Sequence, residues 1–192
     1  FYVILQKMER LIALDVETTG LRISEGHRII EVGAVEILDR EITNTEFQKY
    51  VQPNRKVGES VNIHGITDQF LINKPQFEKI SDDFLSFIEG ATLVIHNAPF
   101  DLGFLNNELK IIGIKETIEN ICTVIDTLAE SRKKSEKQGQ RHSLDALCRR
   151  FEIDDSSRTK HGALIDARIL AKVYLAMTGG QSILFQEVAK TE

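Results

Sequence analysis

LIALDVETTGL, residues 11–21, is an apolar run that ends in two carboxylates with one residue between them. The apolar part of the run predicts a buried β-strand. Side chains at positions i and i+2 of a strand project from the same face, so Asp15 and Glu17 lie side by side. Two ionised carboxylates on one face repel each other, so either the pKa of one of them rises or a cation binds between them. That cation is either a lysine or arginine side chain or a bound metal ion, and the first basic residue after the pair is Arg22, beyond a turn.

The segments that follow predict an α/β fold. Residues 28–38 and 45–53 have the composition of two further strands, and the short polar connection between them, residues 39–44, favours an antiparallel hairpin. Short apolar strands are then expected at 92–97 and 120–127, alternating with segments of helical periodicity. A strand meander followed by strand–helix alternation indicates one mixed five-stranded sheet that contains an antiparallel strand pair and is flanked by helices. The expected helices span residues 76–89, 98–112, 143–151 and 162–177, with a short one running to 131.

Two further acids fall at the end of an element or on an inward face. In HNAPFDLGF, residues 96–104, Asp101 lies in the first turn of an expected helix, where the helix dipole alone also favours an acid. In HGALIDARILAKVYLAM, residues 161–177, Asp166 lies on the apolar stripe of its helix and therefore faces the core. A buried carboxylate is costly unless it is paired or binds a metal ion. His161 precedes this helix and is expected on the loop that enters it.

The four acidic side chains described above form a candidate metal site. Carboxylate oxygens with water ligands suit Mg²⁺ or Mn²⁺, whereas structural zinc prefers cysteine and histidine. Two such ions about 3.5–4 Å apart are the usual arrangement for in-line attack on a phosphodiester bond. Histidine exchanges a proton near neutral pH, which makes His161 the candidate general base. The candidate metal ligands are Asp15, Glu17, Asp101 and Asp166.

The motifs DVETTG, HNAPFD and HGALIDA resemble the three motifs of the DEDD exonuclease superfamily, in its histidine-bearing branch. The stretch from SLDALCRRFEID to YLAMTGGQ, residues 143–181, is more specifically similar to the family of proofreading epsilon subunits of bacterial DNA polymerase III. The resemblance runs from about residue 11 to residue 181. It implies a ribonuclease H-like fold and the 3′→5′ removal of nucleotides from DNA 3′ ends, with deoxynucleoside 5′-monophosphates as products.

The resemblance also implies roles for individual residues. The four carboxylates match the family's ligands for two divalent ions, Mg²⁺ or Mn²⁺, and His161 matches its general base. The segment ESVNIHGIT, residues 59–67, resembles the family's loop that approaches the terminal nucleotide. The implied catalytic residues are Asp15, Glu17, Asp101, His161 and Asp166. The implied substrate-binding residues are Asp15, Glu17, Thr18, Glu59, His64, Phe100 and Asp166.

Two of the implied substrate contacts also have ordinary structural explanations. His64 fits a loop histidine that caps the turn before Gly65. Phe100 fits a core residue equally well. The sequence leaves both explanations open beside the functional ones.

The chain divides into three expected parts. Residues 1–7 precede Met8, a plausible native start, and are expected to be a leader or an expression remnant. Residues 8–180 form the exonuclease domain, with Gly179 and Gly180 expected to end its last helix. Residues 181–192 form a C-terminal tail. Three tail residues resemble the short peptide by which replication proteins dock on the sliding clamp, although a chance match or packing of the tail remains open: Gln181, Leu184 and Phe185.

Composition limits the possible partners. The chain has 192 residues, which suits one domain, and its 42% apolar and 28% charged residues are ordinary for a soluble globular protein. No apolar run approaches the roughly 20 residues that span a bilayer, so no membrane partner is expected. Two cysteines without metal-ligand spacing indicate reduced thiols in a cytoplasmic protein. The net charge of −5 argues against a broad nucleic-acid-binding surface, so a polymerase catalytic subunit or a sliding clamp is expected to hold the DNA.

Two alternative functions remain open. An RNA-directed 3′→5′ exonuclease of the same superfamily shares the motifs, and the long match through residues 143–181 is what favours the DNA enzyme. A non-catalytic scaffold that links clamp and polymerase belongs to another class of protein. Such a scaffold would have no need of five reactive residues, and all five are present.

Overall fold

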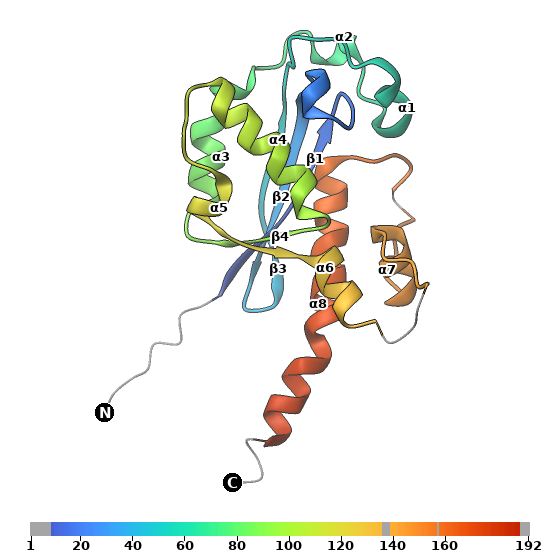
Figure 1. The fold of residues 1–192 in the computed structure, drawn as a ribbon. Coiled ribbons are helices and arrows are strands. Elements are labelled where there is room, and N and C mark those ends of the chain that lie inside the picture. Colours follow the sequence, from blue (N-terminus) through green and yellow to red (C-terminus); the bar gives the residue numbers. More distant parts are fainter. Residues whose placement is uncertain (1–8, 136–138, 157, 189–192) are drawn as a thin grey trace, which may run out of the picture.

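Five strands form one mixed sheet with the order β3-β2-β1-β4-β5 (Figure 1). The computed structural model describes residues 9–135, 139–156 and 158–188, and for residues 180–188 it describes the backbone alone. β1 pairs antiparallel with β2, and β2 pairs antiparallel with β3, whereas β4 runs parallel to β1 and β5 parallel to β4. This topology confirms the predicted fold class. The strands are β1 Arg10–Thr18, β2 Ile29–Leu38, β3 Glu41–Tyr50, β4 Thr92–Ile95 and β5 Thr123–Asp126.

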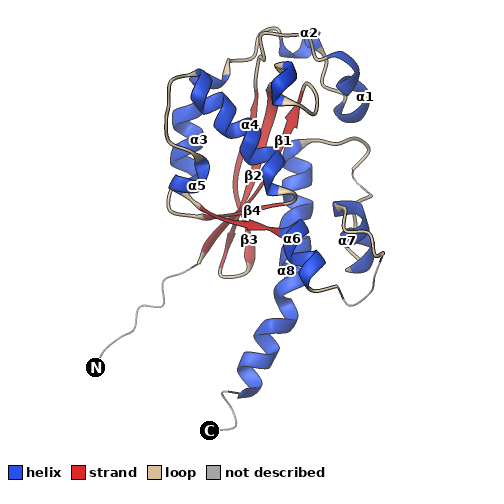
Figure 2. Cartoon of the chain, in the orientation of Figure 1, coloured by secondary structure: helices blue, strands red, loops and turns tan. Residues whose placement is uncertain are grey.

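Helices pack around this sheet (Figure 2). None of the helices in the described part of the chain is both long and apolar enough to cross a membrane. The longer helices are α3 Ser81–Ile88, α4 Ala98–Ile111, α6 Thr127–Lys133, α7 Leu144–Arg150 and α8 Ala163–Val188. The shorter elements are α1 Val61–His64, α2 Asp68–Leu71 and α5 Ile118–Ile121, with 3₁₀ turns η1 Ile23–Glu25, η2 Gly58–Ser60 and η3 Phe77–Lys79.

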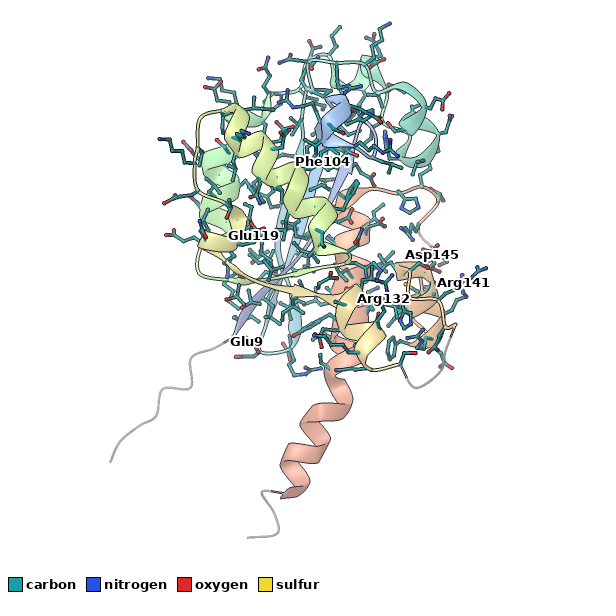
Figure 3. All side chains as sticks on the ribbon, in the orientation of Figure 1. Glu9, Phe104, Glu119, Arg132, Arg141 and Asp145 are labelled. Atoms are coloured by element: carbon teal, nitrogen blue, oxygen red, sulfur yellow. The ribbon has the colours of Figure 1, made fainter. Side chains whose placement is uncertain are left out.

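One face of the sheet packs against α3 and α4. The even-numbered residues of β1, from Ile12 to Val16, belong to the hydrophobic cluster on this face. The same cluster contains Phe84 of α3 and Phe104 of α4, the second of which is labelled in Figure 3. Burying one such side chain completely contributes about 1.5–3 kcal/mol. This cluster therefore holds α4, and with it the first turn of that helix, against the sheet.

The opposite face of the sheet packs against α8. Leu11 and Ala13, on odd-numbered positions of β1, cluster with Leu170 of α8. Strand alternation places Asp15 and Glu17 in the same row, beyond the last apolar residue. Both carboxylates therefore lie at the carboxyl end of β1, on the side of the sheet where α8 begins.

The start of α8 lies directly against β2. A β-carbon on Gly33 would lie 2.1 Å from the Leu164 nitrogen and 2.2 Å from the Ala163 carbonyl carbon, so only glycine leaves room for the helix backbone. Glu31, two residues earlier on the same face of β2, is 1% exposed. Its Oε2 accepts a hydrogen bond from the Ala163 nitrogen at 3.0 Å, and its Oε1 accepts one from Gln48 Nε2 at 2.7 Å. These contacts fix the position of the first turn of α8 on the sheet.

Three predicted elements differ in detail from the structure. In the strand expected at 120–127, only residues 123–126 form β5, because residues 118–121 form the short helix α5. The β2–β3 connection is only Asp39 and Arg40, both with positive φ, which is typical of the tight two-residue turn of a hairpin. β3 begins at Glu41, whereas the predicted strand began at residue 45. The polar residues 41–44 are tolerated because one face of this strand is exposed. The predicted helix at 76–89 is divided into η3 and α3, because the chain makes a 3₁₀ turn before the α-helix starts at Ser81.

The prediction that Gly179 and Gly180 end the last helix is wrong, because α8 continues to Val188. A glycine inside a helix costs about 1 kcal/mol relative to alanine but keeps its backbone N–H, so it weakens the helix without ending it. The expected tail therefore begins inside a helix. The expected clamp peptide consists of Gln181, Leu184 and Phe185, whose side chains are not among the described parts of the chain. Residues 1–8 also lie outside the described residues.

We expect Gly33→Ala to lower the free energy of unfolding by about 1–3 kcal/mol or more, because the added methyl group must displace backbone of α8. Urea unfolding followed by circular dichroism would record this as a lower midpoint at an unchanged slope. Gly179→Ala, inside α8 itself, is the control, since its added β-carbon would meet the nearest atom at 3.8 Å. That variant should be neutral or stabilising. An unchanged midpoint in Gly33→Ala would contradict the close approach of helix and strand.

Candidate active site

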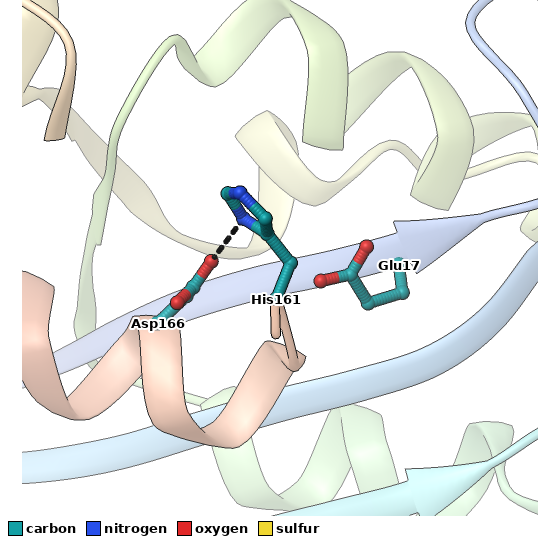
Figure 4. Close-up of side chains that lie close together, drawn as sticks. All are labelled: Glu17, His161 and Asp166. Atoms are coloured by element: carbon teal, nitrogen blue, oxygen red, sulfur yellow. Dashed lines mark hydrogen bonds and ion pairs between the residues drawn. The ribbon is translucent and has the colours of Figure 1, made fainter. Parts of the chain in front are cut away.

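Three predicted site residues meet at the carboxyl end of β1. One ligand atom from each of Glu17, His161 and Asp166 lies within 4.8 Å of the others. Figure 4 shows that Glu17 projects from β1, Asp166 from the beginning of α8, and His161 from the loop that leads into α8. The fold thus brings together residues that are almost 150 positions apart in the sequence.

Asp15 and Asp101 lie next to this group. Asp101 is 3% exposed in the first turn of α4, and its Oδ1 accepts a hydrogen bond from the Val16 nitrogen at 3.1 Å. This bond ties the start of α4 to β1 at the residue between the two strand carboxylates. The charges of Asp101, Asp166 and Glu17 all act on Asp15. We call these four carboxylates the acidic cluster.

Burial and mutual repulsion disfavour the charged forms of the acidic cluster. Burial, with the neighbouring charge of Asp101 as the next cause, raises the pKa of Asp15 well above its ordinary value. Burial also raises the pKa of Glu17 to about 8, and the charge of Asp166 adds to this rise. Burial raises the pKa of Asp101 to about 8, although the hydrogen bond from Val16 opposes the rise. A divalent cation close to these groups would favour their charged forms.

The donor set of the acidic cluster fits a hard divalent cation. Its members offer carboxylate oxygens, which Mg²⁺ and Mn²⁺ prefer. Asp166 Oδ1 is buried and accepts no hydrogen bond from the described residues, although Arg158 Nε lies 2.6 Å from it as an ion pair. A buried acceptor without an aligned hydrogen bond is incompletely satisfied, and a metal ion would satisfy this oxygen.

Arg158 is a site residue that the sequence analysis did not identify. Its Nη2 donates a hydrogen bond to Asp166 Oδ2 at 2.7 Å and lies 2.6 Å from His161 Nδ1. Its Nη1 donates to Asp145 Oδ1 on α7. From the sequence, the cation that neutralises Asp15 and Glu17 could be a basic side chain or a metal ion. Arg158 supplies part of that charge, since it lowers the pKa of Asp15 against the larger effect of burial.

Glu31 is a second residue that the sequence analysis missed. It lies directly opposite Glu17 in the β1–β2 register, and its charge contributes to the raised pKa of Glu17. It accepts a hydrogen bond from the nitrogen of Ala163, a residue that lies between His161 and Asp166 in the sequence. This bond places Glu31 at the entry to α8. The only signal in the sequence was an acid within an apolar strand.

A cavity of about 630 Å³ lies beside the acidic cluster and shares Glu17 with it. It is bordered by β1, by the loop around η2 and α1, and by the start of α4. Two of the predicted substrate-binding residues, Asp15 and Asp166, do not line it and lie in the acidic cluster instead. The predicted substrate-binding residues that do line it are Glu17, Thr18, Glu59, His64 and Phe100.

His64 and Phe100 also make the structural contacts that the sequence allowed. His64 Nδ1 accepts a hydrogen bond from the Ile66 nitrogen at 3.0 Å, and burial lowers the pKa of His64. His64 Nε2 is buried and has no hydrogen-bond partner among the described residues. The ring of Phe100 lies 5.0 Å from that of Phe104 and packs against the core. Both residues therefore combine a structural contact with a place on the cavity wall, and their roles toward a ligand stay predictions.

A mixed five-stranded sheet with acids at the carboxyl end of its central strand is the architecture of ribonuclease H-like exonucleases. Solved structures of that class share the fold of this chain. The nuclease domain of 3′hExo, a DEDDh family member bound to rAMP, superimposes with a TM-score of 0.78 at 18% identity, covering 91% of this chain and 94% of that one. Exonuclease X in complex with 5′ overhanging duplex DNA gives a TM-score of 0.66 at 24% identity, covering 91% and 93%. Likenesses at these identities establish the fold.

The chain belongs to the exonuclease family RNase_T, whose model matches residues 12–174. DNA polymerase III subunit epsilon of Escherichia coli (strain K12) is 52% identical over 180 residues, which are 90% of this chain and 73% of that protein. The same subunit of Pasteurella multocida (strain Pm70) is 50% identical over 183 residues, 93% of this chain and 72% of that protein. These matches confirm the resemblance predicted from the motifs. Exonucleases of the DEDD type use divalent metal ions.

We expect the metal-free protein to lose stability as the pH rises from about 5 to about 8, with the loss levelling off above that. Glu17 and Asp101 each have a pKa of about 8 in the folded protein, whereas in the unfolded chain they ionise near their ordinary values. The folded state therefore binds more protons in this range, and unfolding becomes easier as they are lost. Urea unfolding in chelator across this range measures the fall. Glu17→Gln should make it shallower, and a midpoint that rises with pH would contradict the raised pKa values.

Proposed function

We propose that the protein is a 3′→5′ DNA exonuclease, the proofreading subunit of a replicative DNA polymerase, which hydrolyses the terminal phosphodiester and releases deoxynucleoside 5′-monophosphates. The observation that carries the proposal is the acidic cluster beside a nucleotide-sized cavity with a histidine at its edge. About half of the residues are identical to those of epsilon subunits from two bacteria, which supports the polymerase context. The proposed catalytic residues are the four carboxylates of the acidic cluster and His161.

We expect the acidic cluster to hold two divalent ions, Mg²⁺ or Mn²⁺. Three observations support this: the ligands are all hard oxygen donors, burial raises the pKa of Asp15, Glu17 and Asp101, and Asp166 Oδ1 accepts no hydrogen bond from the described residues. When bound, such ions make a water molecule more acidic and stabilise charge on the phosphodiester oxygens. The four residues come from β1, α4 and α8, so their spacing is set by packing of rigid elements.

His161 is proposed to accept the proton of the attacking water. Its side chain is 47% exposed, so the ring can reach water above the acidic cluster. Its Nδ1 lies 3.0 Å from Asp166 Oδ2. A ring that donates its Nδ1 hydrogen to this carboxylate keeps Nε2 free to take up a proton, which is the arrangement by which acids orient histidine bases.

The cavity is proposed to hold the 3′-terminal nucleotide. Its volume of about 630 Å³ lies within the usual range for small-molecule sites. Phe100 offers an aromatic face on which a base can stack, and Glu59 is exposed on the loop that borders the cavity. Because Glu17 belongs to both the cavity and the acidic cluster, a nucleotide seated there would place its phosphate near the carboxylates. Thr18 and His64 complete the proposed nucleotide contacts.

The proposed partners follow from the charge of the chain and from the similarity. A net charge of −5 gives weak attraction to the DNA backbone, so the polymerase catalytic subunit is proposed to deliver the 3′ end. Docking on the sliding clamp through Gln181, Leu184 and Phe185 is proposed from their sequence pattern. Replication in bacteria takes place in the cytoplasm, which is the proposed location. The domain limits at residues 7/8 and 180/181 are likewise proposals.

An RNA-directed exonuclease is the second candidate. The solved 3′hExo nuclease domain, which shares the fold, is bound to rAMP. At 18% identity that likeness concerns the fold, whereas the epsilon subunits match at 50–52%, so DNA is the favoured substrate.

We expect the protein with Mn²⁺ or Mg²⁺ to release deoxynucleoside monophosphates faster from a primer with a mispaired 3′ end than from the matched primer. A frayed end reaches a cavity for one nucleotide without the cost of unpairing. An RNA of the same sequence is digested in parallel, and Asp15→Ala is the inactive control. Preference for the RNA would favour the second candidate, and no activity on any of the three substrates would contradict an exonuclease.

His161→Ala should reduce the exonuclease rate by about 10²–10⁴-fold, the usual contribution of a general base. It should keep Mn²⁺ affinity close to that of the wild type, because the acidic cluster is intact. Asp15→Ala should lose both Mn²⁺ binding and activity. Calorimetric titration with Mn²⁺ separates the two effects, and equal affinity in wild type and Asp15→Ala would refute the ligand assignment.

A further inference from the structure

Arg158 brings a positive charge into the acidic cluster. Its side chain is 9% exposed, and it contacts both carboxylate oxygens of Asp166, which is 5% exposed. Nη2 donates a hydrogen bond to Oδ2 at 2.7 Å, and Nε lies 2.6 Å from Oδ1. Oδ1 nevertheless accepts no hydrogen bond from the described residues, so the second contact is an ion pair without hydrogen-bond alignment. The carboxylate is thus neutralised but incompletely satisfied.

Asp145 gives the same guanidinium a second acidic partner outside the acidic cluster. Nη1 of Arg158 donates to Asp145 Oδ1 at the start of α7, where Figure 3 labels Asp145. The side chain of Asp145 is 51% exposed, in contrast to the buried Asp166. Arg158, Asp145 and His161 also line a cavity of about 550 Å³. The guanidinium therefore lies between the buried carboxylate of Asp166 and the cavity, where it meets the exposed carboxylate of Asp145.

Arg158 also constrains His161. Its Nη2 lies 2.6 Å from His161 Nδ1, which itself lies 3.0 Å from Asp166 Oδ2. Arginine can only donate, so a hydrogen directed from Nη2 to Nδ1 makes Nδ1 the acceptor. The neutral ring then carries its own hydrogen on Nε2 and cannot take up a proton there. In this arrangement the ring is in the wrong tautomer for a base acting through Nε2.

We propose that Arg158 is a resident counter-ion of this site, which neutralises Asp166 while no divalent ion is bound and which divalent-ion binding displaces toward Asp145. The inference rests on the proposed function, because it takes Asp166 as a metal ligand. A guanidinium at 2.6–2.7 Å from both oxygens of Asp166 occupies the positions that an ion at about 2.0–2.1 Å would need. Displacement of Arg158 also releases His161 Nδ1, so metal binding and the tautomer of His161 change together.

Competition for Asp166 predicts effects of opposite sign for the two partners. Arg158→Met removes the competing charge but keeps an apolar stem, so Mn²⁺ affinity should rise about tenfold or more. Asp145→Asn removes the charge that receives the displaced guanidinium, so Mn²⁺ affinity should fall about three- to tenfold. The double variant should resemble Arg158→Met, because Asp145 acts through Arg158.

The test is calorimetric titration of the whole chain with Mn²⁺ alone, without nucleic acid. Arg149→Met is the matched control: Arg149 lies on α7, lines the same cavity and carries the same charge, but contacts no carboxylate among the described residues. Its affinity for Mn²⁺ should stay within about twofold of wild type. Melting temperatures in chelator and in saturating Mn²⁺ provide a second readout. Arg158→Met should melt lower than wild type in chelator and gain more from Mn²⁺.

Mn²⁺ affinity in Arg158→Met equal to or weaker than wild type would overturn the proposal and leave Arg158 with a purely structural role. If Arg158→Met does not fold, Asp145→Asn decides, and an unchanged Mn²⁺ affinity there would overturn the proposal. If neither wild type nor Arg158→Met binds Mn²⁺, the metal site and the counter-ion are refuted together. The primer assay tests the proposed function separately, because inactivity on DNA with the expected Mn²⁺ shifts would refute the substrate and keep the counter-ion.

Discussion

The contact between β2 and the first turn of α8 is the constraint on which the rest of the site depends. Gly33 allows the helix backbone to touch the strand, and Glu31 accepts the hydrogen bond of the Ala163 nitrogen. Asp166 on the helix and His161 just before it take their positions from this junction. A strand that carries none of the proposed catalytic residues thereby sets the geometry of two of them. Sites held by rigid elements in this way are positioned more accurately than sites on loops alone.

The site stores unfavourable electrostatics that the rest of the fold must offset. Burial disfavours the charged forms of Asp15, Glu17 and Asp101. Asp166, in contrast, already forms an ion pair with Arg158. Groups with such shifted pKa values gather at functional sites, because a bound cation or substrate recovers the lost free energy. The two hydrophobic clusters on either face of the sheet supply the stability that allows this.

Local periodicity predicted much of this arrangement. Strand alternation placed Asp15 and Glu17 on one face, and the helical stripe placed Asp166 toward the core, because each depends on residues a few positions away. Glu31 was missed because its partner Ala163 is distant in the sequence. Arg158 was missed although Asp166 and His161 are close to it in the sequence, because it lies in an irregular loop where no periodicity indicates which way a side chain points. The length of α8 was misjudged for a different reason: the cost of glycine inside a helix is small enough for the surrounding helix to outweigh it.

The two missed residues act on the same short loop from opposite ends. Arg158 is anchored at Asp145, the partner that it keeps in the proposed metal-bound state, and Ala163 is anchored by Glu31, while His161 between these anchors is 47% exposed. An exposed side chain normally samples several rotamers, which would weaken a catalytic base. Fixing the backbone on both sides restricts the ring without burying it, so it keeps access to water. The combination of an exposed ring and buried anchors is therefore what allows a loop residue to serve the acidic cluster.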